Sequence, residues 1–152
     1  MLIATLAIVI VIALFVMGRV SQTGQAPGSV DGRLKHCPDK PNCVCSEYRR
    51  DTEHFIEALE LSEQSAASSL ATLRAIITES GGVIISERAD YIAATFTSSL
   101  FGFVDDLEIR LDKDEALIHI RSASRVGHGD LGANRKRVEL IRARFRQIQA
   151  SN

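Results

Sequence analysis

The hydrophobic pattern begins with an uncharged apolar segment. Residues 2–17 carry no charge and a single polar side chain, and the run stops at Gly18 and Arg19. A bilayer-spanning helix usually needs about 20 apolar residues, with a lower limit near 17. A cleaved signal would have a basic segment before the run and small residues after it. The pattern therefore favours a transmembrane anchor, or an uncleaved signal, over residues 1–20, with residues 2–17 in contact with membrane lipid.

The segment after the anchor has the composition of a linker. Residues 21–33, SQTGQAPGSVDGR, are rich in Gly, Ser and Gln, which is typical of a flexible tether. The single folded domain is expected over residues 34–152. Arg19, Arg33 and Lys35 follow the apolar run, which places the domain in the cytoplasm by the positive-inside rule. An export segment with a short N-terminus places it outside. We favour a single-pass protein of a bacterial-type inner membrane with a periplasmic domain.

Two segments repeat apolar residues with the period of a helix. Residues 62–80 do so at offsets of 4, 3 and 4, with Ser62 as an N-cap and two glycines at the end. Residues 132–149 do so at offsets of 3, 4 and 3. Each segment predicts an amphipathic helix. The apolar faces consist of Ala66, Leu70, Leu73 and Ile77 in the first helix, and of Val138, Ile141, Phe145 and Ile148 in the second.

Four further segments have the length of strands and are separated by turn-like residues: 83–87, 91–98, 103–111 and 116–126. The last two also alternate apolar and polar residues. One sheet face is then apolar and the other polar, with His119 as a solvated strand residue. A fifth strand is expected within residues 54–61, while residues 37–46 are expected to form a loop braced by two prolines. The predicted fold class is α+β: an antiparallel sheet of about four to five strands with two helices packed on one face, preceded by one N-terminal transmembrane helix.

Net charge argues against a nucleic-acid partner, and the context of a glycine-rich motif argues against a nucleotide. Eighteen Lys plus Arg against nineteen Asp plus Glu give a net charge of -1, so the basic field of a nucleic-acid-binding protein is missing. Residues 127–132 read GHGDLG and match the dinucleotide fingerprint G-x-G-x-x-G. That fingerprint acts within a βαβ unit, which the pattern does not predict here. We expect no nucleic acid, no nucleotide, no metal and no other cofactor.

The three cysteines lie together in residues 37–46, CPDKPNCVCS. The spacing of Cys37 and Cys43 permits a structural disulfide, which would leave Cys45 as a free thiol. A metal site formed with His36, or redox chemistry at the thiols, stays open as an alternative. No Cys-x-x-Cys spacing occurs, which weakens the metal interpretation.

The glycine-rich turn before the last helix is a candidate anion pocket. A helix N-terminus presents unpaired backbone donors, and arginines suit a carboxylate or phosphate. Asp130 is a candidate helix cap. The alternative is that Asp105, Asp106 or Asp130 neutralises the arginines and leaves an internal ion-pair network. The candidate anion-binding residues are Arg121, Ser122, Ser124, Arg125, Gly129, Asn134 and Arg135.

Three stretches carry a resemblance to a known family. They are CPDKPNCVCS, the segment FVDDLEIRL with Asp105 and Asp106, and RSASRVGHGDLGANRKRVELIR from Arg121 to Arg142. With these motifs the chain resembles the domain-of-unknown-function 1499 family over residues 35–145. Cys45 stands where the family pattern has Ser. The resemblance implies no catalytic residues, because the family has no assigned function.

The combined pattern favours a membrane-anchored binding, scaffold or accessory protein at the membrane surface, with a membrane-protein complex as a candidate partner. We do not expect an enzyme and assign no catalytic residue. The alternative is a small hydrolase or a thiol or metal redox protein. It would use His128, or Cys37, Cys43 and Cys45.

Overall fold

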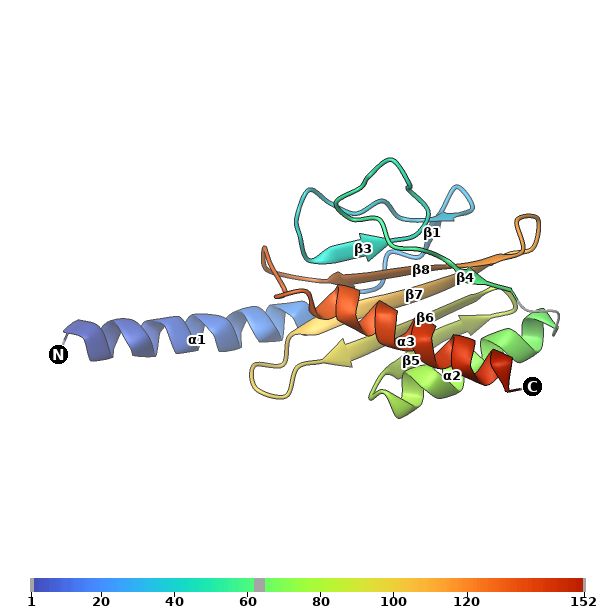
Figure 1. Cartoon of the computed structure of the whole chain (residues 1–152). Coiled ribbons are helices and arrows are strands. Elements are labelled where there is room, and N and C mark those ends of the chain that lie inside the picture. The colour runs from blue at the N-terminus through green and yellow to red at the C-terminus, as the bar shows by residue number, and fades with distance from the viewer. Residues whose placement is uncertain (1, 62–64, 152) are drawn as a thin grey trace.

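The computed structural model describes residues 2–61 and 65–151. A long N-terminal helix projects from one end of a layered α+β domain (Figure 1). The elements in order are α1 (Leu2–Gln22), β1 (Ser29–Val30), β2 (Arg33–Leu34), β3 (Cys43–Cys45), β4 (Leu59–Glu60), α2 (Ala66–Glu79), β5 (Val83–Arg88), β6 (Tyr91–Thr97), β7 (Val104–Asp112), β8 (Leu117–Ser124) and α3 (Ala133–Ala150). The predicted fold class is confirmed.

The main sheet is six-stranded and antiparallel, in the order β3-β8-β7-β6-β5, with β4 also paired to β8. Strands β5 to β8 form in the four segments where strands were predicted. The expected loop at residues 37–46 instead contains β3, because the chain beyond its two prolines pairs with Ala123 to Arg121 of β8. The strand expected over residues 54–61 shortens to Leu59–Glu60, which pairs farther along the same edge.

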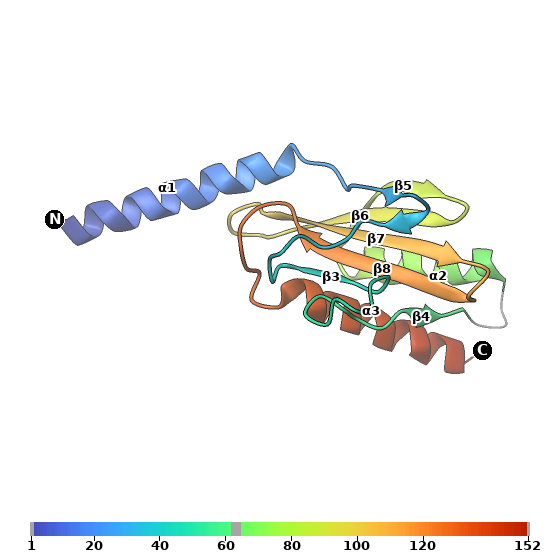
Figure 2. The same ribbon diagram turned by 90° about the horizontal axis from the view of Figure 1, so that it is seen from above.

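Helices α2 and α3 cover one face of the sheet, as predicted (Figures 1 and 2). The apolar residues of β7 and β8 that alternate toward this face meet the apolar stripes of both helices. Ser65 caps α2 by accepting from the Ser68 backbone N–H at 3.2 Å, whereas the expected cap Ser62 lies outside the described residues. The fully buried side chains here include Leu73, Ile77, Leu107, Ile109, Ile118, Ile120, Val138 and Ile141.

The opposite face carries charged side chains that are buried rather than solvated. Glu108 is 0% exposed and lies opposite Arg121 in the β7–β8 register, with 3.0 Å between Glu108 Oε2 and Arg121 Nη1. The Tyr91 hydroxyl donates to Glu108 Oε1 at 2.8 Å. His119 on the same face is 6% exposed, so the expectation of a solvated histidine is wrong. Alternation correctly placed His119 on the polar face, but other segments of the chain cover that face, so it is not exposed to water.

The segment between α1 and β3 provides that cover, although residues 21–33 were expected to form a flexible linker. Residues 21 and 22 belong to α1, and β1 and β2 form an antiparallel hairpin. The Gly28 backbone N–H donates to Glu108 Oε1 at 2.8 Å, and Leu34 is fully buried. Burial of a carboxylate requires hydrogen-bond donors, and this segment supplies one of them.

The buried pair yields a test by Glu108→Ala. Removal of one partner leaves Arg121 as an uncompensated buried charge, so the free energy of unfolding should fall by about 3–5 kcal/mol. Glu87→Ala is the matched control, because Glu87 pairs with Arg74 at the surface and should change stability by less than about 1 kcal/mol. Urea unfolding of the detergent-solubilised protein, followed by circular dichroism, measures both. Equal losses in the two variants would contradict this role of Glu108.

Candidate functional site

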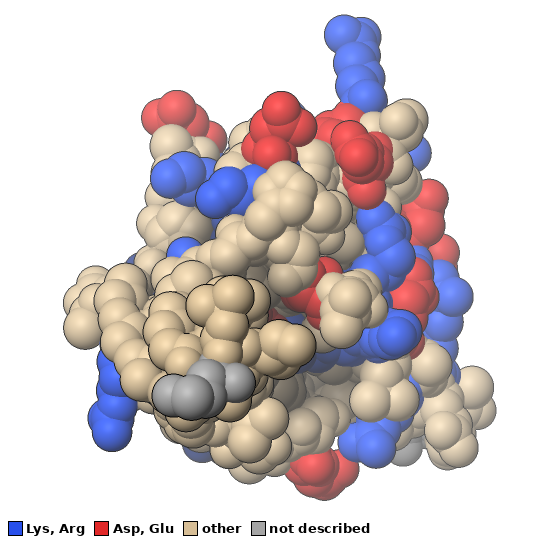
Figure 3. Space-filling model, turned by 90° about the vertical axis from the view of Figure 1, so that its left-hand side faces the viewer, with Lys and Arg blue, Asp and Glu red and all other residues tan. Residues whose placement is uncertain are grey.

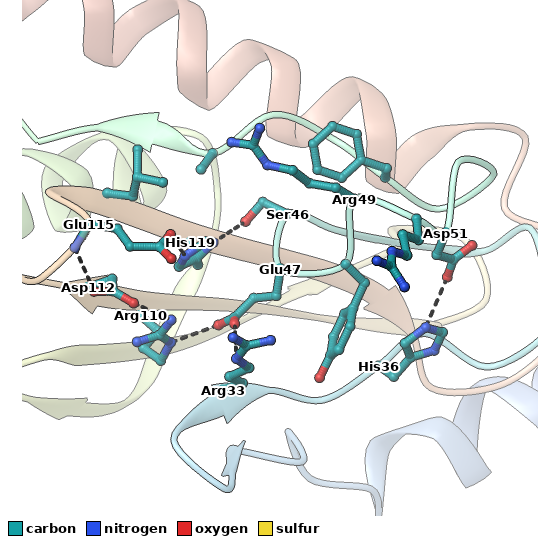
Figure 4. A pocket seen from close by; sticks show the side chains of 15 residues that line it. Arg33, His36, Ser46, Glu47, Arg49, Asp51, Arg110, Asp112, Glu115 and His119 are labelled. Atoms are coloured by element: carbon teal, nitrogen blue, oxygen red, sulfur yellow. Dashed lines mark hydrogen bonds and ion pairs between the residues drawn. The ribbon is translucent and has the colours of Figure 1, made fainter.

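A pocket of about 410 Å³ opens beside the charged face of the sheet (Figure 4). Its floor comes from the end of β7 and the start of β8, one wall comes from the connection between β3 and β4, and β2 contributes the rim. Figure 4 shows acidic, basic and imidazole side chains converging from these elements. The labelled lining residues are Arg33, His36, Ser46, Glu47, Arg49, Asp51, Arg110, Asp112, Glu115 and His119.

His119 is held in one orientation by Ser46. Ser46 Oγ lies 3.1 Å from His119 Nδ1 and accepts from the Ile120 backbone N–H at 2.9 Å. When the Ser46 hydroxyl donates to His119 Nδ1, the neutral ring carries its own proton on Nε2. Burial lowers the pKa of His119 from its usual value, which keeps the ring neutral at pH 7. His119 therefore offers a hydrogen-bond donor on its far side.

Glu47 is enclosed by donors. Its Oε1 accepts from the Leu34 backbone N–H at 3.0 Å and from Arg110 Nε at 2.7 Å, and Oε2 lies 3.8 Å from Arg33 Nε. Arg110 also donates to Asp112 Oδ2 at 3.1 Å. The two carboxylates and two guanidinium groups form a chain of alternating sign. Their charges balance within the pocket floor.

Asp51 and His54 brace the other end of the pocket. His54 Nδ1 lies 2.8 Å from Asp51 Oδ1, and His54 Nε2 lies 3.0 Å from the Lys40 carbonyl oxygen. Burial acts to lower the pKa of His54, but these two acceptors favour the protonated ring and raise the pKa overall. Burial likewise acts to raise the pKa of Asp51, but the His54 hydrogen bond lowers it overall. His36 Nε2 lies 3.4 Å from Asp51 Oδ2.

The charges left over in the pocket are mainly positive. Arg49 and Arg50 are exposed and have no ion-pair or hydrogen-bond partner among the described residues. Figure 4 shows Arg49 extending along the pocket. The unbalanced acid is Glu115, which is 62% exposed and whose Oε2 lies 3.9 Å from His119 Nε2. Two free guanidinium groups and an imidazole N–H suit a small anion such as a carboxylate or phosphate.

Asp112, Glu115 and His119 also meet the distance requirement for a metal cluster, since one candidate ligand atom from each lies within 4.8 Å of the others. Asp112 is already engaged: Oδ1 accepts from the backbone of Asp114 and Glu115, and Oδ2 from Arg110. Those backbone hydrogen bonds and Arg110 lower the pKa of Asp112. Arg110 and two backbone N–H groups therefore compete with a cation for the Asp112 carboxylate oxygens. The arrangement therefore favours an anion over a cation.

The seven candidate residues of the glycine-rich turn do not meet at one place. Arg121 and Arg125 project to the charged face and bind Glu108 and Asp106, the latter through two bonds of 2.9 and 2.7 Å. With Ser124 they line a hollow under the N-terminal segment. Alternation along β8 sends Ser122 to the helix side, where it donates to Asn134 at 2.6 Å.

The remaining members of that set are also placed apart. Gly129 is exposed, and Arg135 donates to the carbonyl oxygens of Phe55 and Glu53. Asp130 satisfies the start of α3 by accepting from the backbone N–H groups of Gly132 and Asn134 at 2.9 and 2.8 Å. The alternative interpretation, an internal ion-pair network, thus applies to Asp106, which pairs with Arg125. It also applies to Asp105, which accepts from Arg137 at 2.7 Å.

All three cysteines are buried, and none presents an exposed thiol. Cys37 and Cys43 form a disulfide with a Cα–Cα distance of 5.7 Å, as the spacing predicted, and Cys45 is a free buried thiol. Burial raises the pKa of Cys45 to about 11, so the thiol is protonated and a poor nucleophile or metal ligand at pH 7. His128 is exposed in its turn.

Fold and site together define a class: an α+β domain with two helices on one face of an antiparallel sheet, a chain-covered charged layer on the other, and a small polar pocket at its margin. The chain belongs to the family described as protein of unknown function (DUF1499), whose family model matches residues 33–145. A search of curated proteins finds no match. The matched range runs from β2 into α3 and leaves α1 outside.

Sequence reasoning missed Ser46, Arg49 and His119 as parts of one pocket. The alternation of β8 signalled that His119 lies on the polar face, and the charged run after Cys45 signalled a polar segment. No local signal links residues 46 and 119, because β3 is short and its pairing with β8 brings distant parts of the chain together.

The two buried histidines should give opposite pH dependences. The lowered pKa of His119 contributes stability above its unfolded value of about 6.5 that is lost as pH falls. The raised pKa of His54 contributes stability below about 6.5 that is lost as pH rises. From pH 5 to 8 the thermal destabilisation by His119→Gln should grow, and that by His54→Gln should shrink. Calorimetric unfolding midpoints measure this, and parallel curves would contradict both assignments.

Proposed function

We propose that this protein is a single-pass membrane protein that holds a small-anion-binding domain at the extracytoplasmic membrane surface. The anchor, the compartment and the ligand class each rest on a separate feature of the chain. Family membership by itself supplies no activity.

The length of α1, its exposed apolar side chains and its contacts with the domain are the main support for a membrane anchor. The helix has 21 residues, and its uncharged part, residues 2–18, spans about 26 Å at 1.5 Å per residue, near the hydrocarbon thickness of a bilayer. Its apolar side chains from Leu2 to Val16 are almost all exposed, whereas Gly18 and Ser21 are buried against the domain. A signal sequence shares this composition, but a cleaved signal gains nothing from contacts with the mature domain. Those contacts favour retention.

The disulfide supports the extracytoplasmic side. Disulfides persist in oxidising compartments and are rare in the cytosol, and the Cys37–Cys43 bridge is buried beneath residues of the covering segment. This argument opposes the positive-inside count, which rests on few basic residues near the helix.

The ligand class follows from the pocket charges. Arg49 and Arg50 lack acidic partners among the described side chains, and His119 presents an N–H group beside them. The cavity of about 410 Å³ is of the size of a small-molecule site. A small carboxylate or phosphate would satisfy the arginines at the exposed side and His119 at the buried side.

The location is tested with Lys113→Cys, which puts a thiol on the exposed β7–β8 turn. The wild-type thiol Cys45 is buried and protonated, so it is the matched control. In right-side-out spheroplasts, a membrane-impermeant maleimide should label the variant and not the wild type, and the protein should stay in the membrane pellet after carbonate washing. Labelling that requires lysis would put the domain in the cytoplasm, and release by carbonate would remove the anchor.

The ligand class is tested with inorganic phosphate as the probe. Ligand binding to the folded state raises the unfolding midpoint, so phosphate should raise it more than chloride at equal ionic strength. Arg49→Gln should remove at least half of that difference, whereas Arg146→Gln, which alters an exposed arginine on α3, should leave it unchanged. Stabilisation by Zn²⁺ with no effect of phosphate would replace the anion with a metal.

A further inference from the structure

The last turn of α1 is fixed to the sheet. Ser21 is 0% exposed; its Oγ donates to the Gly18 carbonyl oxygen at 2.6 Å and accepts from the Val104 backbone N–H at 3.1 Å. Arg125 donates to the Ser21 carbonyl oxygen at 3.2 Å while Asp106 holds its guanidinium group. A cation at the C-terminal end of a helix is favourable because the helix dipole is negative there. The anchor therefore meets the domain without a flexible joint.

The loop between β6 and β7 runs beside α1. A Cβ added to Gly18 would lie 1.8 Å from the Phe101 carbonyl oxygen, so the close approach requires glycine. The rings of Phe15 and Phe101 pack edge to face with 5.2 Å between centroids. The loop thus contacts the helix on the N-terminal side of Arg19, within the apolar run.

This contact sets a depth for the loop in the bilayer. Phe15 precedes Arg19 by four residues, which is about 6 Å along a helix axis. The headgroup layer on each side of a bilayer is about 5–8 Å thick. If α1 spans the membrane with Arg19 among the headgroups, Phe101 lies at the boundary between headgroups and acyl chains.

Two leucines at this end are exposed to an unusual degree. Leu100, next to Phe101, is 68% exposed, and Leu131 in the β8–α3 loop is 98% exposed with a left-handed φ of 56°. A leucine rarely adopts that backbone conformation. Figures 1 and 2 show the β6–β7 and β8–α3 loops at the end of the domain from which α1 projects. Scattered exposed leucines need no explanation, but these two share one end with a membrane helix.

Figure 3 looks onto this end, with the uncharged surface of α1 projecting toward the viewer and both basic and acidic side chains around it. The basic side chains would attract anionic lipid and the acidic side chains would repel it, so the two effects oppose each other. The apolar side chains beside the helix carry the case for the bilayer as the partner, because insertion of apolar surface does not depend on charge.

We propose that the β6–β7 loop inserts Leu100 and Phe101 into the membrane interface beside α1, and that Leu131 of the β8–α3 loop rests in the same interface. The domain then sits directly on the bilayer in one orientation, held at three points. This inference rests on the proposed function in one respect, that α1 lies in the membrane.

The chain contains no tryptophan, so a single introduced tryptophan reports its own depth. Leu100→Trp and Leu131→Trp variants of the full chain are reconstituted in phosphatidylcholine vesicles that carry bromine at carbons 6 and 7 of the acyl chains. Val9→Trp, in the middle of α1, is the reference inside the bilayer. Lys113→Trp, on the opposite hairpin turn, is the reference in water. Circular dichroism confirms that each variant folds.

Brominated lipid should reduce the fluorescence of Leu100→Trp and Leu131→Trp at least twofold and protect both from aqueous acrylamide, while Lys113→Trp shows the reverse. Quenching of Val9→Trp with none at Leu100→Trp would overturn the inference and leave the anchor in place. Quenching at Leu100→Trp without quenching at Leu131→Trp would overturn the proposed contact between Leu131 and the membrane. Absence of quenching at Val9→Trp would overturn both the anchor and the inference.

Discussion

The ion pair of Glu108 and Arg121 is buried, and the arrangement of the N-terminal half depends on it. Transfer of two charges out of water costs several kcal/mol per ion and is offset only when further hydrogen bonds satisfy both groups. The Tyr91 hydroxyl and the Gly28 backbone N–H provide these bonds to the carboxylate. Among the described residues, Arg121 Nε is buried without a hydrogen-bond partner. Burial still raises the pKa of Glu108 above its usual range. The charged layer is therefore stable only while the segment that precedes β3 lies across it.

That requirement connects the sheet to α1. Only a few residues separate the last turn of α1 from Gly28, so a segment held against the charged layer also holds the end of α1. Asp106 and Arg125 extend the layer by one more pair, and Arg125 reaches the Ser21 carbonyl oxygen. The arginine that the sequence offered as an anion ligand is thus a link between anchor and sheet. Its charge is used internally, by Asp106 and the Ser21 carbonyl oxygen.

Helical and strand periodicity predicted most of the fold from the sequence. Strand length and turn-like separators gave β5 to β8, apolar spacing gave α2 and α3, and the cysteine spacing gave the disulfide. Alternation reports which face a side chain occupies, but it does not report what covers that face, so His119 was expected in water. Pairing between distant segments has no local signal either, and β3 was expected as a loop after Pro41. The pocket is built from such pairings, which explains why its members were missed.

In the proposed membrane arrangement, β7 holds the contact with α1 and the pocket at separate heights above the bilayer. Val104 at its start binds Ser21 of α1, and Arg110, opposite His119, lies six residues farther along the strand. At about 3.4 Å per residue, this separates the pocket floor from the anchor contact by about 20 Å. That distance exceeds the thickness of the headgroup layer, so in the proposed arrangement His119 faces the aqueous compartment and not the lipid. A domain held in one orientation by α1 would therefore meet soluble anions at this pocket, while its loops meet the membrane.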